Sequence, residues 1–303
     1  MGSEMCIRDS FITVHWQNPQ WVDVQLQQIH RHAERASVYA YLNGIDPEPY
    51  RDRFAYCGTH EIQSHAIKLN LMAELVCREA DEADLLVFLD GDAYPVASVD
   101  ALAVRLSEQK PLIAVRRDEN NGDPQPHPCF CVTTVGFWNR IRGDWRSGYR
   151  WTGVDGRQVT DVGGNLLGLL REAGVAWEPL LRSNARNLHE MWFGVYGGMV
   201  YHHGAAFRDQ PFARAEEGKL RLNARERALK RVLDAMPARI RNGILDPIHP
   251  VRAKRRALVR ENQALSATMQ ELAVNDPDRL LRILTTTEPD PVIEALAPAQ
   301  GEL

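Results

Sequence analysis

The chain has 303 residues, of which 36 are Lys or Arg and 40 are Asp or Glu, and its formal net charge is −4. This length allows one large α/β domain with an extension, or two small domains. The negative charge argues against nucleic acid as a partner, and no apolar run reaches the roughly 18 residues that a transmembrane helix needs.

The first ten residues, MGSEMCIRDS, lack the apolar segment of a signal peptide. They look unrelated to the rest of the chain and are similar to a translated cloning remnant. We therefore treat residues 1–10 as a non-native leader and leave them out of the fold prediction.

The chain contains five cysteines, an odd and sparse set for a disulfide framework. This usage is typical of reduced thiols in a cytoplasmic protein. Cys129 and Cys131 are spaced to face the same side of a strand. A metal site there needs two more ligands, and only His127 is near in sequence, so buried thiols are the favoured interpretation.

Strands and helices alternate over the first 115 residues. Residues 11–16 and 37–42 are rich in β-branched and aromatic side chains and are predicted strands. Asn18-Pro19 begins the helix between them. Apolar residues at three- and four-residue spacing predict a longer helix over about residues 60–80.

Residues 85–89, LLVFL, form the third predicted strand. They are apolar without alternation, which is typical of a strand covered on both faces. Ser98 caps a short helix, and residues 111–117 form a fourth strand. This repetition predicts an α/β fold with a mostly parallel sheet and helices on both sides.

The pattern is looser between residues 118 and 212. Residues 129–138 are a predicted strand that lies between polar loops. A further helix is predicted to begin at Asp161 and to end at Gly174. A last strand and turn are predicted over residues 199–208, MVYHHGAAFR.

The composition changes after about residue 213. Between Arg214 and Arg260 there are 14 Lys or Arg residues and 5 Asp or Glu residues. One amphipathic helix is predicted to end at Pro237. The next carries a heptad-like apolar seam from Leu258 to Leu272, with the polar Asn262 at one core position.

We therefore predict that residues 213–303 form a helical basic extension whose last 15 residues are frayed. Basic amphipathic helices can lie on anionic membranes, where lipid-linked acceptors reside. The seam could instead pair two chains, although two heptads are fewer than a convincing coiled coil has. Peripheral membrane contact or dimerisation through residues 213–275 are thus two hypotheses, and packing on the rest of the chain is the third.

The segment LLVFLDGDAYPV, residues 85–96, ends a buried strand in two carboxylates, Asp90 and Asp92. In an open parallel sheet, ligands bind beyond the carboxyl ends of the strands. Two carboxylates one residue apart can share a hard cation such as Mg²⁺ or Mn²⁺, which commonly also holds the phosphates of a substrate. Gly91 between them lets backbone and ligand approach closely.

Three chemistries fit a D-x-D pair at a strand end. A Walker-type nucleotide hydrolase needs a G-x-x-x-x-G-K-[ST] loop, which the sequence does not contain. A phosphotransferase of the haloacid-dehalogenase type has its pair on the first strand, followed by Gly-Thr. Here Ala93-Tyr94 follow a pair on the third strand, so this alternative is the less favoured one. The third chemistry is metal-dependent sugar transfer from a nucleotide sugar.

Residues 64–96 and the later YHHGAAFR resemble family-2-like glycosyltransferases of GT-A fold. That family carries a His-x-x-x-Leu-Asn helix pattern, an apolar strand that ends in D-x-D, an aromatic-Pro continuation and a late His-x-Gly segment. The matching residues here are His65, Leu69, Asn70, Asp90, Asp92, Tyr94, Pro95 and His202. The resemblance covers about residues 11–212 and implies a GT-A-type catalytic domain over that range.

By this resemblance, Asp92 is expected to bind Mn²⁺ or Mg²⁺ directly, and Asp90 to contact the ribose or a metal-bound water. His202 or His203 is expected to complete the metal site, since neutral imidazole is a competent ligand. Only one of two adjacent residues in a strand can face the site. His202 fits the His-x-Gly spacing better.

An inverting transferase also needs a base that deprotonates the acceptor hydroxyl. The resemblance points to Asp161, although Thr160-Asp161 replaces the Glu-Asp pair common in the family, and Asp155 is the reserve candidate. A helix cap without chemistry is the alternative role of Asp161.

Asn43 follows the second strand, where relatives contact the nucleobase. Lys68 and Arg117 are candidates for holding the diphosphate or an acidic acceptor, or else are surface charges. We therefore predict a hexosyl-type, inverting glycosyltransferase that uses a nucleotide-sugar donor and a glycan, lipid-linked or small-molecule acceptor. A catalytically inactive GT-A-like protein that binds a nucleotide or glycan is the alternative from another functional class. We expect a cytoplasmic protein, with a location at the membrane periphery as the alternative.

Overall fold

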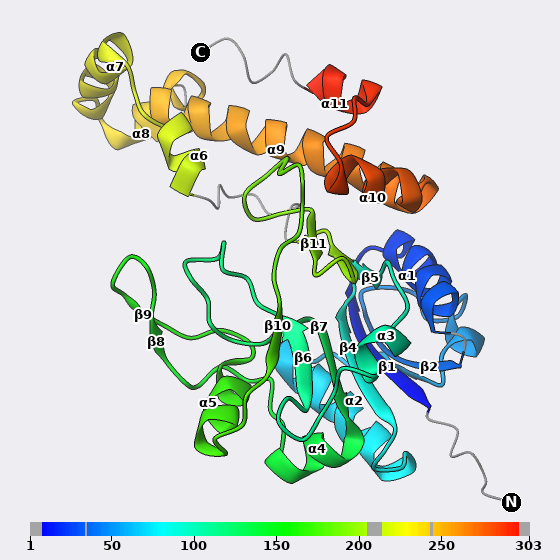
Figure 1. Cartoon of the computed structure of the whole chain (residues 1–303). Helices are drawn as coiled ribbons and strands as arrows, with labels where there is room; N and C mark the ends of the chain where they lie inside the picture. Colours follow the sequence, from blue (N-terminus) through cyan, green and yellow to red (C-terminus); the bar gives the residue numbers. More distant parts are fainter. Residues whose placement is uncertain (1–7, 34, 205–213, 243–244, 297–303) are drawn as a thin grey trace, which may run out of the picture.

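The computed structural model describes residues 8–33, 35–204, 214–242 and 245–296. An α/β part holds the central sheet, and a set of C-terminal helices lies across one end of it (Figure 1). None of the helices in these described ranges combines the length and apolar composition needed to cross a membrane.

The central sheet has seven strands in the order β10-β6-β7-β4-β1-β2-β3. Strand β7 runs antiparallel to β4 and β6, and the other neighbouring strands are parallel. The strands are β1 (Asp9–Trp16), β2 (Ala36–Asn43), β3 (Tyr56–Gly58), β4 (Leu85–Asp90), β6 (Leu112–Val115), β7 (His127–Thr134) and β10 (Glu178–Leu180). The predicted mostly parallel sheet is confirmed.

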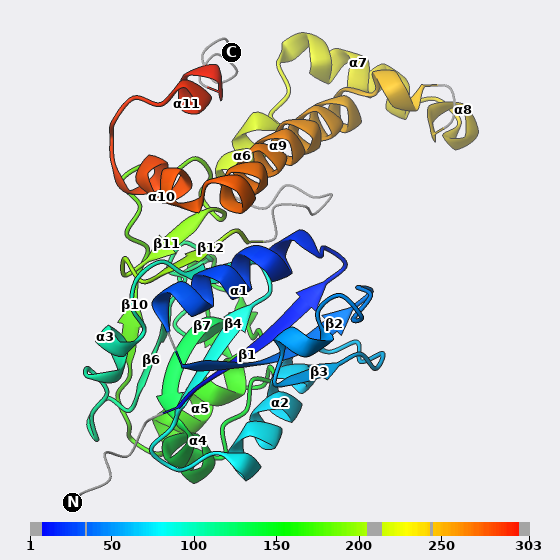
Figure 2. The same cartoon turned by 90° about the vertical axis from the view of Figure 1, so that its right-hand side faces the viewer.

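Helices cover both faces of this sheet (Figure 2). They are α1 (Gln20–His32), α2 (His65–Glu79), α3 (Asp100–Ala103), α4 (Val135–Ile141) and α5 (Gly164–Glu172), with one 3₁₀ turn, η1 (Arg51–Arg53). Helix α2 begins where Ser64 accepts a hydrogen bond from the N–H of Ile67 at 3.3 Å. The α/β class with helices on both faces of the sheet is therefore confirmed as well.

Strand β4 shows how the two layers are built. Leu85, Val87 and Leu89 belong to the apolar cluster that contains α1, and Leu86 and Phe88 belong to the cluster that contains α2. Successive side chains of a strand point to opposite faces. Asp90, the next residue, therefore continues the row that faces α2.

Two smaller sheets complete the α/β part. One has the order β11-β12-β5, and the other pairs β8 with β9. Their strands are β5 (Ala93–Pro95), β8 (Trp151–Thr152), β9 (Gln158–Val159), β11 (Gly194–Tyr196) and β12 (Val200–His202). Because β12 pairs with β5, which directly follows the aspartate pair, the late segment with the two histidines lies beside the end of β4.

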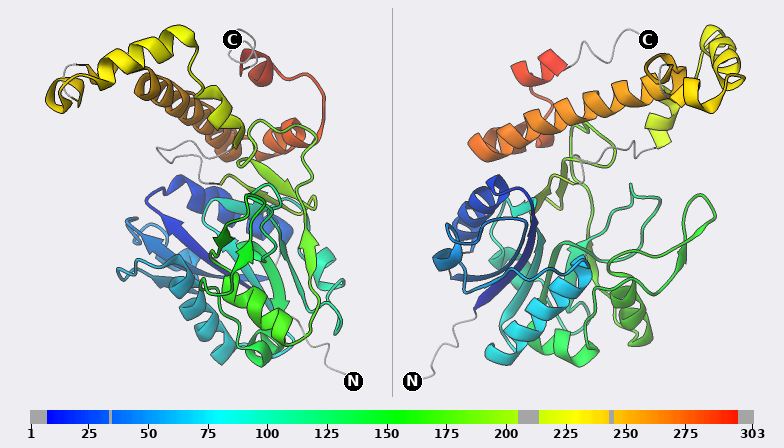
Figure 3. Two further views of the ribbon diagram at one scale, coloured as in Figure 1. Left: turned by 90° about the vertical axis from the view of Figure 1, so that its left-hand side faces the viewer. Right: turned by 180° about the vertical axis from the view of Figure 1, so that it is seen from behind.

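The C-terminal helices form the extension that the sequence predicts. They are α6 (Arg214–Lys219), α7 (Ala224–Asp234), α8 (Ala238–Asn242), α9 (Pro250–Asn275), α10 (Pro277–Thr285) and α11 (Pro291–Leu296). A second 3₁₀ turn, η2 (Asp246–Ile248), lies between α8 and α9. Helix α11 lies within the last 15 residues, the segment that the sequence predicts to be frayed. Figure 3 shows α9 spanning from α7 and α8 to the side of the molecule that carries α1 and β11.

The extension shares a third apolar cluster with the α/β part. This cluster joins Met269 and Leu280 of the extension to Trp21 of α1 and Tyr201 of β12. In the predicted seam, Leu258 and Met269 are buried, and Asn262 donates a hydrogen bond to Glu216 Oε1 at 2.6 Å. The seam residues thus pack within their own chain, as the third hypothesis expects.

Three boundaries differ from the predictions. The strand predicted over 129–138 ends at Thr134, because the Thr134 hydroxyl accepts the N–H of Phe137 and starts α4. The helix predicted from Asp161 starts at Gly164, after Gly163 with φ 99°. Strand β1 starts at Asp9, so Asp9 and Ser10 of the predicted leader pair with β2 and β4. Residues 1–7 of the predicted leader and residues 205–208 of the predicted last turn lie outside the described residues.

The cysteines of the described chain are free thiols, and Cys129 and Cys131 are buried, as predicted. The two thiols do not face one side, however. Cys131 packs in the cluster with α2, and Cys129 packs in the cluster with α1. The pairing of β7 with β6 shifts register between Cys131, opposite Ala114, and His127, opposite Val115, and this irregularity breaks the alternation that the prediction assumed.

Candidate functional site

The aspartate pair lies at the carboxyl end of β4, in the middle of the central sheet. Gly91 separates the two residues where the chain passes the end of β1. A Cβ atom at Gly91 would lie 2.5 Å from the Val14 carbonyl oxygen and 2.8 Å from His15 Cα. Glycine is therefore required between the carboxylates because the neighbouring backbone occupies the space of any side chain.

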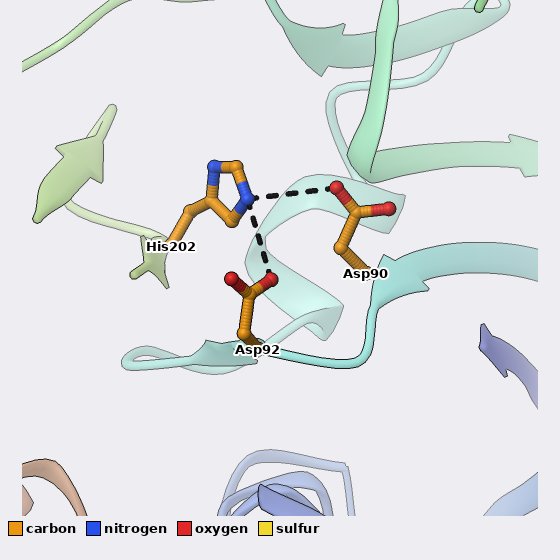
Figure 4. Close-up of side chains that lie close together, drawn as sticks. All are labelled: Asp90, Asp92 and His202. Carbon is orange, nitrogen blue, oxygen red and sulfur yellow. Dashed lines mark ion pairs between the residues drawn. The ribbon is translucent and has the colours of Figure 1, made fainter. Parts of the chain in front are cut away.

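His202 completes a compact group with both carboxylates (Figure 4). Strand β12 pairs antiparallel with β5 and sets His202 opposite Ala93, next to Asp92. His202 Nε2 lies 3.5 Å from Asp90 Oδ2 and 3.4 Å from Asp92 Oδ1. One ligand atom from each of the three residues lies within 4.8 Å of the others. The predicted approach of Asp92 and a late histidine is thus confirmed.

His203 faces away from this group. Its two ring nitrogens lie 2.9 Å from the Tyr201 hydroxyl and 3.0 Å from Ser266 Oγ, and its backbone N–H donates to the Asp92 carbonyl at 3.0 Å. Burial lowers the pKa of His203 to about 4. Of the two predicted histidines, the structure brings His202 to the aspartates and uses His203 to tie their loop to α9.

Two further histidines surround Asp90. His65 Nε2, at the start of α2, lies 3.0 Å from Asp90 Oδ1 without hydrogen-bond geometry, and both atoms are buried without another partner. The ring of His127 lies 5.9 Å from that of His202, centroid to centroid. Burial by itself would raise the pKa of Asp90, but the three imidazoles around it hold that pKa well below its usual range.

His202 and Asp92 each stabilise the charged form of the other, so their pKa values move in opposite directions. Burial alone would lower the pKa of His202, but Cys129 and Asp92 raise it well above its ordinary value. Burial would likewise raise the pKa of Asp92, but His202 lowers it. Asp90 and Asp92 therefore place two negative charges close together, and a proton on His202 offsets part of that charge. A divalent cation would offset the same charge, and imidazole must be neutral to ligate a metal.

The chemistry of this donor set fits a divalent metal ion. Two carboxylates and one imidazole suit Mg²⁺ or Mn²⁺, which prefer oxygen and accept imidazole ligands. Asp90 Oδ1 is a buried oxygen that no hydrogen bond satisfies, and such an atom is costly unless a ligand completes it. Asp90, Asp92 and His202 therefore form a potential metal site.

A cavity of about 710 Å³ opens beside this site. Its walls come from the ends of β1 and β4, the start of α2, the β6–β7 region and α9. The lining includes Trp16, Lys68, Asp90, Asp92, Arg117, Asp161, Trp192, His202, Ser266 and Gln270. Such a volume suits a ligand the size of a small organic cofactor.

Lys68 is a buried cation in the wall of this cavity. Its side chain is 1% exposed, and its Nζ lies 5.5 Å from the ring centre of Trp16 and 5.6 Å from that of Tyr41. No carboxylate of the described chain forms an ion pair with it. Burial lowers the pKa of Lys68. An ammonium held only by aromatic faces is a good partner for an incoming anion.

Arg117 is a second cation of the cavity wall. It donates a hydrogen bond to the Met191 carbonyl at 3.1 Å, and its Nε lies 3.6 Å from Glu119 Oε1. Nε has no hydrogen-bond partner. The cavity thus contains both an anionic group that suits a cation and two cations that suit an anion.

Of the other predicted site residues, one lines the cavity and two lie outside its lining. Asp161 lines the cavity, three residues before α5, and its Oδ1 accepts the Val162 N–H at 2.8 Å. Asp155 is not among the lining residues and accepts the Arg157 N–H in the β8–β9 turn. Asn43 also lies outside the lining, where its side chain donates to the His15 carbonyl at 3.4 Å.

Several lining residues had no predicted role. Ser266 and Gln270 come from α9, in the segment predicted as a separate extension. Nothing in the local sequence distinguishes them from other polar helix residues. His65 belongs to the family pattern in the sequence, and it directly follows Ser64, the residue that caps α2. The long-range pairing of β12 with β5 is what brings the whole set together.

No protein-family model matches the chain, and no curated protein does. Several solved structures are similar to parts of it, and they are glycosyltransferases. Apo-form GlyE of Streptococcus pneumoniae TIGR4 matches with a TM-score of 0.35 and 11% identity over 45% of this chain and 36% of that chain. The bifunctional WbbM apo structure matches with a TM-score of 0.31 and 10% identity over 47% of this chain and 34% of that one.

The galactosyltransferase LgtC, in complex with donor and acceptor sugar analogs, matches with a TM-score of 0.33 and 12% identity. That match covers 55% of this chain and 72% of LgtC. The chain spans about a third of the length of GlyE and WbbM. Because these similarities are low, the chemistry assigned to the site is argued from the residues and geometry of this chain alone.

Proposed function

We propose that the protein is a metal-dependent glycosyltransferase, related to the family-2-like enzymes, that moves a sugar from a nucleoside-diphosphate sugar to a hydroxyl acceptor. One observation carries the proposal. The Asp90–Asp92–His202 group opens into the same cavity as the buried Lys68 and the partly buried Arg117. A nucleoside diphosphate together with its divalent cation presents the complementary charges to both.

Each side chain has a separate task in this proposal. Asp92 and His202 hold Mn²⁺ or Mg²⁺, and Asp90 holds either the ion or the ribose of the donor. The bound ion supplies Lewis-acid stabilisation of the departing diphosphate. Lys68 and Arg117 neutralise the phosphate charge that develops as the sugar leaves. The narrow fit around Gly91 keeps both carboxylates in place without reorganisation.

Asp161 is our candidate for the base that accepts the proton of the acceptor hydroxyl in an inverting reaction. It is an exposed carboxylate in the cavity lining. Asp155, the reserve candidate, does not line the cavity. Asp161→Asn should lower transfer and leave the binding of Mn²⁺ and of a nucleoside diphosphate unchanged, as measured by calorimetry.

The test of the proposal is a donor panel. The purified chain is incubated with UDP-, GDP-, dTDP- and CMP-linked sugars, with Mn²⁺ or with a chelator, and release of the nucleotide is measured. We expect release from one nucleoside-diphosphate sugar that depends on the metal and is lost in Asp92→Asn. Asp144→Asn, which changes a carboxylate outside the cavity, is the matched control and should retain activity.

The inactive alternative has a separate signature. A chain that only binds would show heat of binding with a nucleoside diphosphate and Mn²⁺ but no release from any donor. Absence of both release and binding across the panel would contradict the transferase proposal and the binding alternative alike.

A further inference from the structure

Helices α7 and α8 lie at the end of the extension farthest from the central sheet (Figures 2 and 3). Nearly all of their described side chains are exposed, and Leu233 is the buried one in α7. Helix α7 is held to α9 by contacts that include the Lys254–Glu226 ion pair at 3.0 Å. The two helices thus form a projecting tip rather than a layer of the core.

Large apolar side chains are exposed on this tip. Val232 is 57% exposed and Ile240 is 45% exposed, and Leu229 and Met236 are exposed as well. The four residues follow one another at three-, four- and four-residue spacing. Leu229 and Val232 therefore share one face of α7. Each of the four side chains keeps between 36% and 57% of its surface exposed, so the row is accessible to an outside partner.

The same tip is strongly basic. From Lys219 to Arg241 the chain carries eight Lys or Arg residues and two acidic residues. Arg225, Arg231 and Arg239 are exposed and form no ion pair with a described acidic side chain. By contrast, Lys230 is paired with Asp234 in α7. The free cations accompany the apolar row on the same two helices.

We propose that the α7–α8 tip docks on an anionic lipid bilayer. Exposed apolar side chains of such a helix enter the boundary between headgroups and acyl chains, while its arginines contact anionic headgroups. A second copy of this chain would bring like charges together, which disfavours pairing through the tip. Nucleic acid would use the cations alone and leave the apolar row exposed to water.

This inference goes beyond the transfer reaction and does not depend on it, because docking is measured without a donor or an acceptor. The full chain is used for the test. Removing the residues after 213 would also remove Met269 and Leu280 from the third apolar cluster, and Ser266 from the cavity. Loss of binding in a truncated chain would therefore not identify the tip.

The experiment is co-sedimentation of the full chain with vesicles of phosphatidylcholine, with and without about one third phosphatidylglycerol. Two double variants are compared with the native chain. Val232→Asp with Ile240→Asp removes the apolar contact, and Arg231→Glu with Arg239→Glu removes the charge. Val104→Asp, at a residue that is 84% exposed just after α3, is the matched control for adding one acidic residue to an exposed apolar position.

We expect binding to the anionic vesicles and little binding to pure phosphatidylcholine. Each double variant should weaken binding by about tenfold or more, and the Val104 variant should bind like the native chain. The proposal is overturned if the native chain does not sediment with anionic vesicles. It is also overturned if either double variant binds normally, or if duplex DNA is bound as tightly and without dependence on Val232 and Ile240. Circular dichroism of each variant confirms that α7 and α9 remain folded.

Discussion

Two carboxylates next to helix α2 have depressed pKa values for different reasons. Asp144 accepts hydrogen bonds from Asn70 Nδ2 at 2.6 Å, from Asn165 Nδ2 at 2.8 Å and from the Arg146 backbone N–H at 2.9 Å. The Arg146 guanidinium, which pairs with Asp144 Oδ2 at 2.9 Å, and these three hydrogen bonds together outweigh burial and lower the pKa of Asp144 to about 2. Asp90 lies among three imidazoles and keeps an unsatisfied oxygen in a site that opens into the large cavity.

The difference between Asp144 and Asp90 teaches that a shifted pKa does not identify a binding site. At Asp144 the partners that shift the pKa also complete the hydrogen bonds, so the carboxylate is a structural acceptor. At Asp90 the surrounding imidazoles shift the pKa, but the carboxylate oxygen Oδ1 still has no hydrogen-bond partner. A shifted pKa occurs in both kinds of site. A buried polar atom that has no hydrogen-bond partner and lies beside a cavity is what distinguishes a candidate ligand site from a stabilising network.

The largest expected effect is on catalysis, at the Asp90–Asp92–His202 group. Asp92→Asn should lower transfer by roughly a thousandfold, because it removes one charged metal ligand from the group that stabilises the leaving diphosphate. The melting temperature should change by less than about 2 °C, since asparagine keeps the size of the side chain and only the 3.4 Å ion pair with His202 is lost. Transfer assays and scanning calorimetry check both parts. Full activity in the variant would exclude Asp92 as an essential ligand.

At Asp144 we expect the reverse: a loss of stability with little change in activity. Asp144→Ala should lower the free energy of unfolding by about 2 to 4 kcal/mol, because Asn70, Asn165 and the Arg146 N–H lose their acceptor. The activity per folded molecule should stay close to that of the native chain. Urea unfolding followed by fluorescence measures the first quantity. A loss of activity without a loss of stability would contradict the contrast between the two sites.

Lys68 offers a smaller test of the cavity. Lys68→Met removes the buried ammonium but keeps the stem that packs against Trp16 and Tyr41. The donor KM should rise by about tenfold to a hundredfold, since a hydrogen bond to a charged group contributes about 1.5 to 3 kcal/mol. Stability should change by less than about 1 kcal/mol, because no ion pair is lost. An unchanged KM would show that Lys68 does not contact the donor.

Asp123 gives a pH-dependent effect that neither of the first two carboxylates shows. Burial raises its pKa from 3.8 to about 7, despite hydrogen bonds from Gln125. Because the folded state binds this proton more tightly than the unfolded state, Asp123 lowers stability as the pH rises from about 4 to about 7. Asp123→Asn should flatten that part of the stability curve in urea titrations. An unchanged slope would contradict a protonated Asp123 in the folded chain.

The sequence could predict those parts of the fold that depend on local pattern. The uniform apolar run before Asp90 predicts a strand buried on both faces, and the spacing of apolar residues in α1 and α2 predicts the two layers. Asp92 and His202 could also be predicted as partners, through the family resemblance. The helix that begins at Val135 was not predicted, because its apolar residues continue directly from those of β7.

Other site residues depend on contacts that no local pattern specifies. His65 faces Asp90 only because α2 starts beside the end of β4, and Ser266 enters the cavity only because α9 packs on α1 and the small sheet. Asp155 and Asn43 illustrate the opposite case. The resemblance suggested Asn43 as a nucleobase contact, and Asp155 was the reserve candidate for the base, but the side chains of both bond to neighbouring backbone groups.

The central claim is that Asp90, Asp92 and His202 hold one divalent cation. The most direct measurement is anomalous diffraction from crystals soaked with Mn²⁺ and UDP. We predict one Mn²⁺ peak within about 2.5 Å of oxygen or nitrogen atoms of these three residues, with the diphosphate bound on its cavity side. A Mn²⁺ peak elsewhere, or no peak at this position in crystals where UDP fills the cavity, would contradict the claim.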